Sequence, residues 1–452
     1  MSDLNHLNTM RSFWLEENPL DLAYRQEALR KLYSVIQKRQ DDIAQALWQD
    51  LHKSSVESYA TEIGFVLQEI THTLKHLSSW SKPRKVKTPL SLFGAQSRIY
   101  AESYGLVLII SPWNYPFQLS IAPLIAAVAA GNCAVIKPSP LAQASAQIIA
   151  EILTETFDNR HVCAFNGENE LTIQLLKEKF DYIFYTGSTS FGKTVMEMAA
   201  QNLTPVTLEL GGKSPCIILP DADLELSAKK IIFGKFLNNG QTCVAPDYVL
   251  VPKHLKEPLL EELKAALSKF YPNYDKLACI ISENHLKRLV GLLANEKVVI
   301  GGSYDYSRRF LEPTIVDEVS FDSPLMQEEI FGGILPLISY DDWQKTLKYL
   351  QSQPKSLAAY IFTQNKSAAE NIISKLSFGG GCINETIMHL VNSNLPFGGV
   401  GLSGMGSYHG KAGFDTFTHY KSILRRKGKR EIAVIYPPYT NRTMKILKRF
   451  MR

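Results

Sequence analysis

The sequence lacks the features that mark several classes of protein. Its longest apolar stretches, such as Ile121 to Ala130, are too short to cross a bilayer. Its N-terminus carries polar and acidic residues where a secretory signal peptide would have an apolar core. No internal repeat or low-complexity segment stands out. We therefore expect a globular protein of the cytoplasm.

Cysteine is scarce and irregularly placed. The six cysteines, at positions 133, 163, 216, 243, 279 and 382, do not have the spacing of metal ligands. Scattered thiols of this kind suit a reducing compartment and disfavour a disulfide scaffold. We therefore predict neither a metal site nor a framework of disulfides.

The body of the chain also lacks an excess of positive charge. The net charge is +5, but residues 421–452 hold eleven Lys and Arg against one acid, Glu431. The rest of the chain is therefore net negative by five charges. The basic balance comes from a C-terminal tail and gives no reason to expect a nucleic-acid partner.

What the sequence does contain is an alternation of apolar strands and helices. With 452 residues, the chain is too long for one ordinary core, so two or three domains are expected. Over residues 105–210, short apolar runs alternate with helical patterns, which predicts a parallel sheet covered on both faces. A second α/β block follows over about 211–395. The fold class is therefore α/β, and ligands are expected at the carboxyl ends of strands.

The region before residue 105 has a different pattern. Residues 20–80 are helical in pattern, and the last long helix is expected to stop near Ser81-Lys82-Pro83. Residues 84–104 alternate and contain Pro89, which predicts a hairpin or arm. The stripe that predicts the long helix consists of Ile63, Leu67, Ile70, Leu74 and Leu77.

The tetrapeptide GQTC, which ends at Cys243, carries the strongest chemical signal. The residues before Cys243 indicate a bent, exposed backbone, whereas most other cysteines lie in apolar runs typical of inert core thiols. Glu209 lies in the motif LELGGK, about thirty residues earlier. A cysteine can act as a nucleophile and a carboxylate can activate water, so the pair predicts covalent catalysis through a thioester. No histidine is near Cys243 in the sequence, so a cysteine–histidine hydrolase has no local support.

A second motif, GSTSFGKT at residues 187–194, follows an expected strand and opens an expected helix. Backbone N–H groups at such a turn can bind phosphate with help from the helix dipole. The motif also matches the Walker A pattern of mononucleotide-binding ATPases. The best partner strand for that function, residues 217–221, contains Pro220. We favour the pyrophosphate of a dinucleotide, although the usual G-x-G-x-x-G fingerprint is absent.

Three further motifs each have a bland and a functional interpretation. Asn114 in PWNYP is a common turn residue, or its amide points at an oxyanion. Lys137 in KPSP is a solvated loop lysine, or it meets a ribose or phosphate. Glu329 and Phe331 belong to a charged loop with a core Phe, or they hold a ribose diol and flank a planar ring. Taken singly, each motif favours the bland interpretation.

The segment LPFGGVGLSGMGSYHGK at residues 395–411 is dense in glycine and predicts a strongly bent loop. His409 within it either lines a pocket or is structural.

Together these motifs resemble those of the NAD(P)-dependent aldehyde dehydrogenase superfamily. PWNYP, KPSP, YTGSTSFGK, LELGGKSP, GQTC, EEIFGG and LPFGGVGLSGMGSYHGK occur in that family's order across nearly the whole chain. GQTCVAPDY and GMGSYHGKAGFDTFTH, with the short N-terminus, resemble class 3, the fatty and aromatic aldehyde branch. The resemblance implies oxidation of medium- or long-chain aliphatic or aromatic aldehydes to carboxylic acids.

The resemblance also implies a role for each motif. Cys243 would attack the aldehyde, and Asn114 with the backbone N–H of Cys243 would hold the oxyanion of the hemithioacetal. Glu209 would activate the water that cleaves the thioester, or would help to deprotonate Cys243. The implied cofactor contacts are Lys137 and Glu329 for the two riboses, Phe331 for the nicotinamide, and Gly187, Ser188 and Gly192 for the pyrophosphate.

The expected cofactor is NAD or NADP. Many NAD-preferring relatives have a glutamate three residues after the lysine, and this chain has Pro140 there. Without that carboxylate, a 2′-phosphate is not repelled, so we expect NADP to be tolerated beside NAD. Gly333 replaces the proline usual after EEIFG, and we expect a slightly looser loop with unchanged chemistry.

The family fold implies a Rossmann-type cofactor domain, an α/β catalytic domain and a small β arm that pairs subunits. In this sequence the cofactor domain takes 1–81 and 105–209, and the catalytic domain takes 210–395. The oligomerisation arm takes 82–104 and 415–440. Class 3 relatives are usually dimers, so a homodimer is expected.

Residues 441–452 form a basic C-terminal tail. A short helix there can lie on an anionic membrane, with weak peripheral contact, or dock on the protein's own surface. The apolar residues of that helix are Met444, Ile446, Leu447, Phe450 and Met451.

Three alternatives stay open at this point. A P-loop ATPase would bind Mg-ATP and not NAD. An inactive relative would not need Cys243, Glu209 and Asn114 together. A CoA-acylating dehydrogenase would pass the acyl group to CoA, whereas Glu209 as a water activator argues for hydrolysis.

Overall fold

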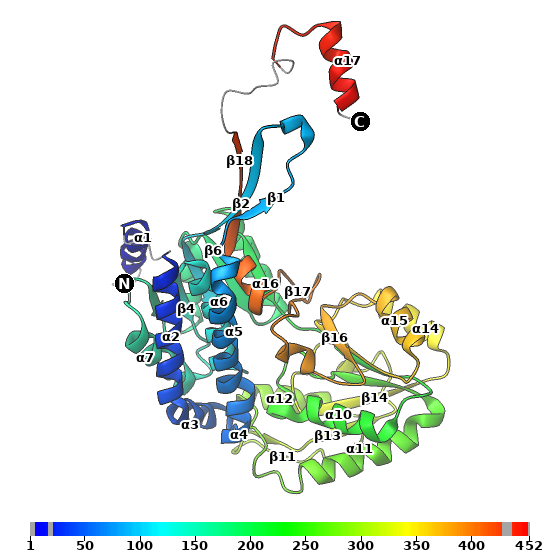
Figure 1. Cartoon of the computed structure of the whole chain (residues 1–452). Coiled ribbons are helices and arrows are strands. Elements are labelled where there is room, and N and C mark those ends of the chain that lie inside the picture. The colour runs from blue at the N-terminus through cyan, green and yellow to red at the C-terminus, as the bar shows by residue number, and fades with distance from the viewer. Residues whose placement is uncertain (1–4, 17–20, 427–435, 451–452) are drawn as a thin grey trace.

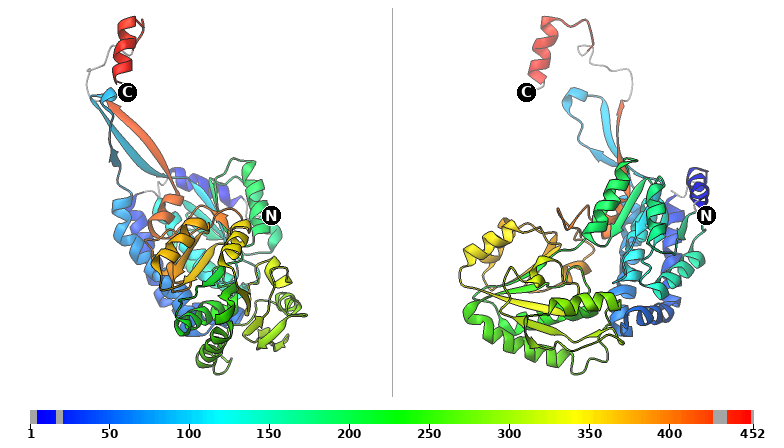
Figure 2. Two further views of the ribbon diagram at one scale, coloured as in Figure 1. Left: turned by 90° about the vertical axis from the view of Figure 1, so that its right-hand side faces the viewer. Right: turned by 180° about the vertical axis from the view of Figure 1, so that it is seen from behind.

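The computed structural model describes residues 5–16, 21–426 and 436–450. Two α/β bodies lie side by side, and a narrow β arm projects from one of them (Figure 1). In two further views the arm still points away from both bodies, and the last helix lies beyond its tip (Figure 2). The predicted α/β class is confirmed, since a sheet with helices on both faces forms each body.

The first sheet has six strands in the order β17-β7-β6-β3-β4-β5. Five of them run parallel, and β17 joins antiparallel at the edge, where Gly404 pairs with Glu209. The parallel strands are almost wholly apolar because both of their faces are covered. The strands are β3 (Leu106–Ile110), β4 (Cys133–Lys137), β5 (Val162–Ala164), β6 (Tyr182–Thr186), β7 (Val206–Glu209) and β17 (Gly404–Met405).

Alternate residues of each strand pack against different helices. In β3, Val107 and Ile109 belong to one core, and Leu106 and Leu108 belong to another. The first core lies under α2 (Leu22–Lys38), α3 (Gln40–Leu51), α5 (Gly64–Trp80), α6 (Pro116–Ala130) and α7 (Gln143–Thr156). The second lies under α1 (His6–Glu16), α8 (Asn169–Lys177) and α9 (Thr189–Ala200). The predicted stop of the long helix near Ser81 is confirmed, since α5 ends at Trp80.

The second sheet has seven strands in the order β10-β13-β14-β9-β8-β15-β16. All neighbours are parallel except β10, which is antiparallel to β13. The strands are β8 (Pro215–Ile218), β9 (Tyr248–Pro252), β10 (Lys297–Ile300), β13 (Thr314–Asp317), β14 (Ile334–Tyr340), β15 (Ala358–Phe362) and β16 (Gly380–Ile383). One face packs on α10 (Leu224–Phe236) and α11 (Lys256–Phe270). The other packs on α12 (Glu283–Leu292), α14 (Trp343–Ser352) and α15 (Lys366–Lys375).

The arm is an antiparallel sheet of three strands. The predicted hairpin or arm over 84–104 is present as β1 (Arg84–Val86) and β2 (Ala95–Ser103). Its third strand, β18 (Thr418–Arg426), pairs with β2 along its whole length from far away in the sequence. Residues 427–435 of the predicted arm lie outside the described residues.

The basic tail contains the helix α17 (Asn441–Phe450). Met444 in this helix is exposed, and Met451 of the predicted apolar set lies outside the described residues. Among the helices described in the three residue ranges, none combines the length and apolar character that a bilayer crossing requires.

Candidate active site

A first cavity lies where the two bodies meet, and it brings together motifs that are far apart in the sequence. One wall follows the carboxyl ends of β3 and β6 in the first sheet. The facing wall precedes the amino ends of β8, β9 and β14 in the second sheet. Its lining residues are Pro112, Trp113, Asn114, Leu119, Thr186, Gly187, Ser188, Leu210, Gly211, Cys243, His285, Glu329 and Phe331.

A second cavity reaches Cys243 from another direction. It is mostly apolar, and it shares only Leu119 and Cys243 with the first cavity. Cys243 is therefore accessible from two separate spaces. The second cavity is lined by Ala60, Thr61, Phe65, Tyr115, Gln118, Leu119, Phe233, Leu237, Thr242, Cys243, Val244, Ile387, Met388, Leu390, Val391, Phe397, Tyr408 and His409.

The backbone before Cys243 is bent, as the sequence predicts. Helix α10 ends at Phe236, and Asn238 and Asn239 then adopt left-handed conformations, with φ of 51° and 50°. Gly240 follows at φ 74°, and a Cβ there would come 2.3 Å from the carbonyl oxygen of Gly332. Cys243 itself is half-buried and not fully exposed, because it lies between the two cavities.

The pKa values of three neighbouring acidic groups, the Cys243 thiol and the carboxyls of Glu209 and Glu329, are raised. Burial raises the pKa of the Cys243 thiol, and the carboxyls of Glu329 and Glu209 raise it further. Burial also raises the pKa of Glu209 well above its usual range. The pKa of Glu329 rises to about 8, first through burial and then through Asp247. Burial therefore favours the protonated form of each of the three groups.

Glu209 is placed at the end of β7 but not in the lining of either cavity. Its side chain is 1% exposed, and neither carboxyl oxygen has a hydrogen-bond partner among the described residues. An unpaired buried carboxyl of this kind is costly, and such groups are common where a protein performs acid–base chemistry.

Asn114 lies beside residues 238–243, which carry the proposed nucleophile Cys243 and are called the nucleophile loop below. Its side-chain Nδ2 donates a hydrogen bond of 3.0 Å to the carbonyl oxygen of Gln241, two residues before Cys243. The backbone oxygen of Asn114 accepts hydrogen bonds of 2.8 Å from both Lys53 and Asn238. An amide nitrogen carries two N–H groups, so one remains to donate toward the cavity that Asn114 lines.

Some residues of the motif GSTSFGKT line the first cavity, and others pack in the core. Gly187 and Ser188 line the first cavity, and Ser188 caps α9 by accepting a hydrogen bond from Phe191 N at 3.3 Å. Gly192 lies in the first turn of α9 and outside the lining, where a Cβ would come 2.7 Å from a Leu210 methyl carbon. Gly192 therefore allows α9 to pack closely, while the N-terminus of α9 opens toward the cavity.

Lys137 is buried at the end of β4, with 1% of its surface exposed. Its ammonium donates to the carbonyl oxygens of Pro138 at 2.8 Å and Gly167 at 2.7 Å. Burial lowers the pKa of Lys137 to about 8. The residue is therefore not the solvated loop lysine of the bland interpretation, although it does not line the first cavity.

Glu329 and Phe331 both line the first cavity. The Glu329 carboxyl lies against Gly211, where a Cβ would come 2.3 Å from its Oε2. Phe331 has a left-handed φ of 55°, and its ring lies edge-on to Trp113 at 5.4 Å between centroids. His285 Nε2 donates a hydrogen bond of 2.8 Å to the Phe331 carbonyl oxygen.

Sequence reasoning missed several residues of the site. Trp113 lies inside a motif that was noticed only for Asn114, and His285 stands in no motif at all. His409, for which a pocket was one possibility, lines the second cavity. The lining residues of that cavity outside the motifs carry no local signal, because they come from the distant segments 60–65, 118–119, 233–237 and 387–391.

The residues of the first cavity fit a dinucleotide better than a mononucleotide with magnesium. A helix N-terminus opens into it at Ser188, and the Trp113 and Phe331 rings and Cys243 also line it. The Walker B candidate Asp221 belongs to the other sheet, where it accepts hydrogen bonds from Thr363 Oγ1 at 2.6 Å and Gln364 N at 3.1 Å. The P-loop ATPase interpretation is therefore wrong.

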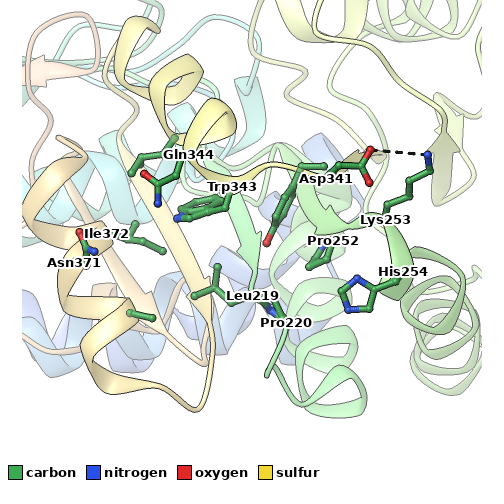
Figure 3. Close-up of a pocket in the computed structure, with 13 residues that line it drawn as sticks. Leu219, Pro220, Pro252, Lys253, His254, Asp341, Trp343, Gln344, Asn371 and Ile372 are labelled. Atoms are coloured by element: carbon green, nitrogen blue, oxygen red, sulfur yellow. Dashed lines mark ion pairs between the residues drawn. The ribbon is translucent and has the colours of Figure 1, made fainter.

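A further pocket lies at the opposite edge of the second sheet (Figure 3). It collects residues that follow the carboxyl ends of β8, β9 and β14, such as Pro220, His254 and Trp343. Its ion pair, Lys253 with Asp341 at 3.9 Å, is exposed. Within the described part of the chain, none of its lining residues has a buried side-chain polar atom without a partner.

Comparisons with known proteins agree with this site. The model of the aldehyde dehydrogenase family matches residues 16–423. A 4,4'-diaponeurosporen-aldehyde dehydrogenase of Staphylococcus aureus is 46% identical over 98% of this chain and 97% of its own length. Aldehyde dehydrogenase family 3 member A2 of Macaca fascicularis is 42% identical over 95% of this chain and 90% of its own.

Solved structures give the same result. The substrate-bound structure of Staphylococcus aureus AldH covers all of both chains with a TM-score of 0.98 and 44% identity. An indole-3-acetaldehyde dehydrogenase in complex with NAD+ shares the fold, with a TM-score of 0.86, 24% identity, and coverage of 93% of this chain and 88% of its own. The chain therefore belongs to the aldehyde dehydrogenase family and is an NAD(P)-dependent enzyme that oxidises aldehydes.

Proposed function

We propose that the enzyme converts medium- or long-chain aliphatic or aromatic aldehydes to carboxylic acids through a thioester on Cys243. The observation that carries this proposal is the position of Cys243 between two cavities, one of which is mostly apolar. A hydrocarbon or aromatic tail loses contact with water in such a cavity, and each buried CH₂ contributes about 0.8 kcal/mol. The printed name of the Staphylococcus aureus relative, which is that of a diaponeurosporen-aldehyde dehydrogenase, supports a long apolar substrate.

The covalent chemistry starts at Cys243. The sulfur forms a bond to the carbonyl carbon, and the carbonyl oxygen becomes an oxyanion. The side-chain amide of Asn114 and the backbone N–H of Cys243 would stabilise that oxyanion, and a single such donor contributes about 2.7–4 kcal/mol. Because burial and two carboxyls raise the pKa of Cys243, the thiol must pass its proton to ionised Glu209 or to water in the adjoining cavity as the carbon–sulfur bond forms.

The first cavity would hold NAD or NADP. Gly187, Ser188 and Gly192 would place the pyrophosphate at the N-terminus of α9, and Lys137 and Glu329 would contact the two riboses. Phe331 would pack near the nicotinamide of the bound cofactor, which would supply the acceptor for the hydride of the substrate.

Glu209 would complete the reaction as the base that activates water. Hydrolysis breaks the carbon–sulfur bond, releases the carboxylic acid and returns the thiol. Since burial raises the pKa of Glu209, the ionised base is populated only at higher pH or after water reaches the carboxyl. The same ionised carboxylate is the form that would help to deprotonate Cys243 in the first step.

The test is NAD(P)H formation across aldehydes of increasing chain length, with wild type beside Cys243→Ser. We expect kcat/KM to rise with chain length until the apolar cavity is full, and we expect no turnover above background in the variant. A matched Cys279→Ser variant changes a buried thiol outside both cavities and should keep full activity. Equal kcat/KM for short and long aldehydes would contradict the proposed substrate class.

Domain organisation follows the same proposal. The first sheet would belong to a cofactor domain of residues 1–81 and 105–209, and the second to a catalytic domain of 210–395. The arm, residues 82–104 and 415–440, would pair two subunits as a homodimer. The exposed apolar side chains of Leu90, Phe93 and Leu424 on the arm support this role. Light scattering of wild type beside a Phe93→Asp variant tests it, with a monomeric variant expected.

We also propose that the tail, residues 441–452, gives a cytoplasmic enzyme weak peripheral contact with anionic membranes. Helix α17 lies beyond the tip of the arm and not on either body (Figures 1 and 2). It carries Lys445, Lys448 and Arg449 beside the exposed Met444. Flotation with anionic liposomes should fall for Met444→Glu, and equal flotation of the variant and wild type would contradict this contact.

A further inference from the structure

A buried ion pair that belongs to none of the motifs contacts the backbone of Asn114 at the candidate active site. Lys53 and Glu62 form a salt bridge, and both side chains are 0% exposed. Replacing such a pair with apolar side chains of similar volume is often neutral or stabilising. Stability alone therefore does not account for two charges at this place.

Glu62 connects the pair to the helix that follows Asn114. It lies in η1 (Tyr59–Ile63), a π-helical turn at the start of α5, and such turns are frequent at functional sites. Its Oε2 accepts hydrogen bonds from the backbone N–H groups of Phe117 at 2.9 Å and Gln118 at 3.1 Å. These are the first-turn donors of α6, whose N-cap residue Tyr115 makes no side-chain capping bond.

Lys53 connects the pair to Asn114 itself. Its ammonium donates a hydrogen bond of 2.8 Å to the backbone oxygen of Asn114 and lies 3.8 Å from the centre of the Tyr115 ring. The Asn238 side chain donates to the same oxygen at 2.8 Å, and the Asn238 N–H donates to Glu57 at 2.8 Å. Two donors thus fix the peptide that carries the Asn114 side chain.

The same peptide is tied to the nucleophile loop at three points. Asn114 Nδ2 donates to the backbone oxygen of Gln241 at 3.0 Å, and Asn238 Nδ2 donates to the backbone oxygen of Asn114 at 2.8 Å. The Tyr115 hydroxyl shares a hydrogen bond of 2.7 Å with Thr242 Oγ1, next to Cys243. A shift of the Asn114 peptide would therefore move the amide relative to the sulfur.

We propose that Lys53 is a positioning residue for aldehyde oxidation, and that its ammonium, held by Glu62, sets the distance between the Asn114 amide and Cys243. The proposal rests on the roles proposed above for Asn114 and Cys243. Lys53 touches neither substrate nor cofactor space, since it lines neither cavity, so its effect acts through Asn114.

The test is a double-mutant cycle on the full-length enzyme. The pair is made neutral in one step, as Lys53→Met with Glu62→Gln, so that neither member of the pair is left charged without the other. The change is made in wild type and in an Asn114→Ala background. The control is Lys256→Met, which breaks the partly buried pair with Asp317, 2.8 Å apart and remote from both cavities.

In the wild-type background we expect kcat/KM for aldehyde to fall about 10²-fold, mostly through kcat, the size expected for a displaced oxyanion donor. The KM for NAD+ should change less than about twofold, and Lys256→Met should leave kcat/KM within about twofold. In the Asn114→Ala background the same neutralisation should cost less than about threefold, because residues that act through one another are not additive.

An equal loss in both backgrounds would show that the pair acts on the fold and not through Asn114, and it would overturn the proposal. If the variant with the neutral pair does not fold, Glu62→Gln alone is used in the same cycle, and the same pattern is expected. Equal losses of kcat/KM in both backgrounds again overturn the proposal. Wild type without aldehyde oxidation would instead contradict the proposed function, so the two failures are distinguishable.

Discussion

The two parallel sheets use opposite edges to build one site. In the first sheet, Asn114, Gly187 and Glu209 stand at or after the carboxyl ends of strands, where ligands of open α/β sheets usually bind. In the second sheet, Cys243 and Glu329 stand before the amino ends of β9 and β14. The proposed reaction site therefore lies where the carboxyl edge of one sheet meets the amino edge of the other.

The difference teaches what each sheet contributes. The first supplies rigid strand ends and the N-terminus of α9, which suit the binding of a fixed cofactor. The second supplies a loop with left-handed Asn238 and Asn239, which brings the nucleophile into position by unusual backbone geometry. The carboxyl edge of the second sheet instead holds the pocket of Figure 3.

The largest expected effect comes from the first sheet. Glu209→Gln should lower kcat about 10³-fold by removing the water base, while a single turnover of NAD(P)H is still formed. Because burial raises the pKa of Glu209, hydrolysis in wild type should speed up as pH rises through that pKa, and the variant should lose this dependence. Stopped-flow absorbance of NAD(P)H measures both, and loss of the first turnover would contradict the assignment.

The next effect tests the strand end that faces Cys243. Asn114→Ala should lower kcat/KM about 10²–10³-fold, a loss of about 3–4 kcal/mol, because one oxyanion donor is gone. The KM for NAD+ should stay within about twofold. Steady-state kinetics measure the change, and a rise in KM for aldehyde without a fall in kcat would show that Asn114 only binds substrate.

A smaller effect concerns the loop after β4. Wild type should use NADP as well as NAD, with a preference below about 10³ in kcat/KM, roughly 4 kcal/mol. Pro140→Glu should shift that ratio toward NAD by about tenfold, because a carboxylate there repels a 2′-phosphate. Pro140→Gln adds a side chain of the same length without the charge and serves as the control. An equal shift of the NAD/NADP ratio in both variants would mean that the shape of the side chain, and not its charge, sets the cofactor preference.

The smallest effect is expected at the carboxyl edge of the second sheet. Trp343→Ala in the pocket of Figure 3 should lower the melting temperature while kcat/KM stays within about twofold, since Trp343 packs on the core but lies outside both cavities at Cys243. Thermal melting and steady-state kinetics on the same preparation separate the two quantities. A loss above about tenfold would show that this edge also serves the reaction.

Much of this arrangement could be predicted from the sequence, for identifiable reasons. The strand–helix alternation over 105–210 is regular, so its periodicity predicted the first sheet. The parallel arrangement in turn predicted a site at the carboxyl ends of the strands. GQTC and GSTSFGKT have unusual composition, and both reach the first cavity. The bend before Cys243 was expected from its neighbours in GQTC, but the left-handed conformations of Asn238 and Asn239 were not.

The remainder depended on long-range contacts that a single sequence does not record. Lys53 and Glu62 meet Asn114 only because α5 packs on α6. The apolar wall takes Phe65, Phe233 and Phe397 from three distant segments, and each alone resembles an ordinary core residue. The burial of Glu209 and Lys137 was also hidden, since neither residue type is usually found inside a protein.

The edge strand β17 has a consequence for redesign of the enzyme. The glycine-rich segment pairs with β7 through Gly404 opposite Glu209, and the same stretch supplies Phe397 and Tyr408 to the apolar wall. A Cβ at Gly404 would come 2.2 Å from the Leu208 carbonyl oxygen, so β17 is packed closely against β7. A shift of β17 would therefore also move β7. Under the role proposed for Glu209, enlarging the wall to admit bulkier aldehydes would therefore also alter how fast the acid is released.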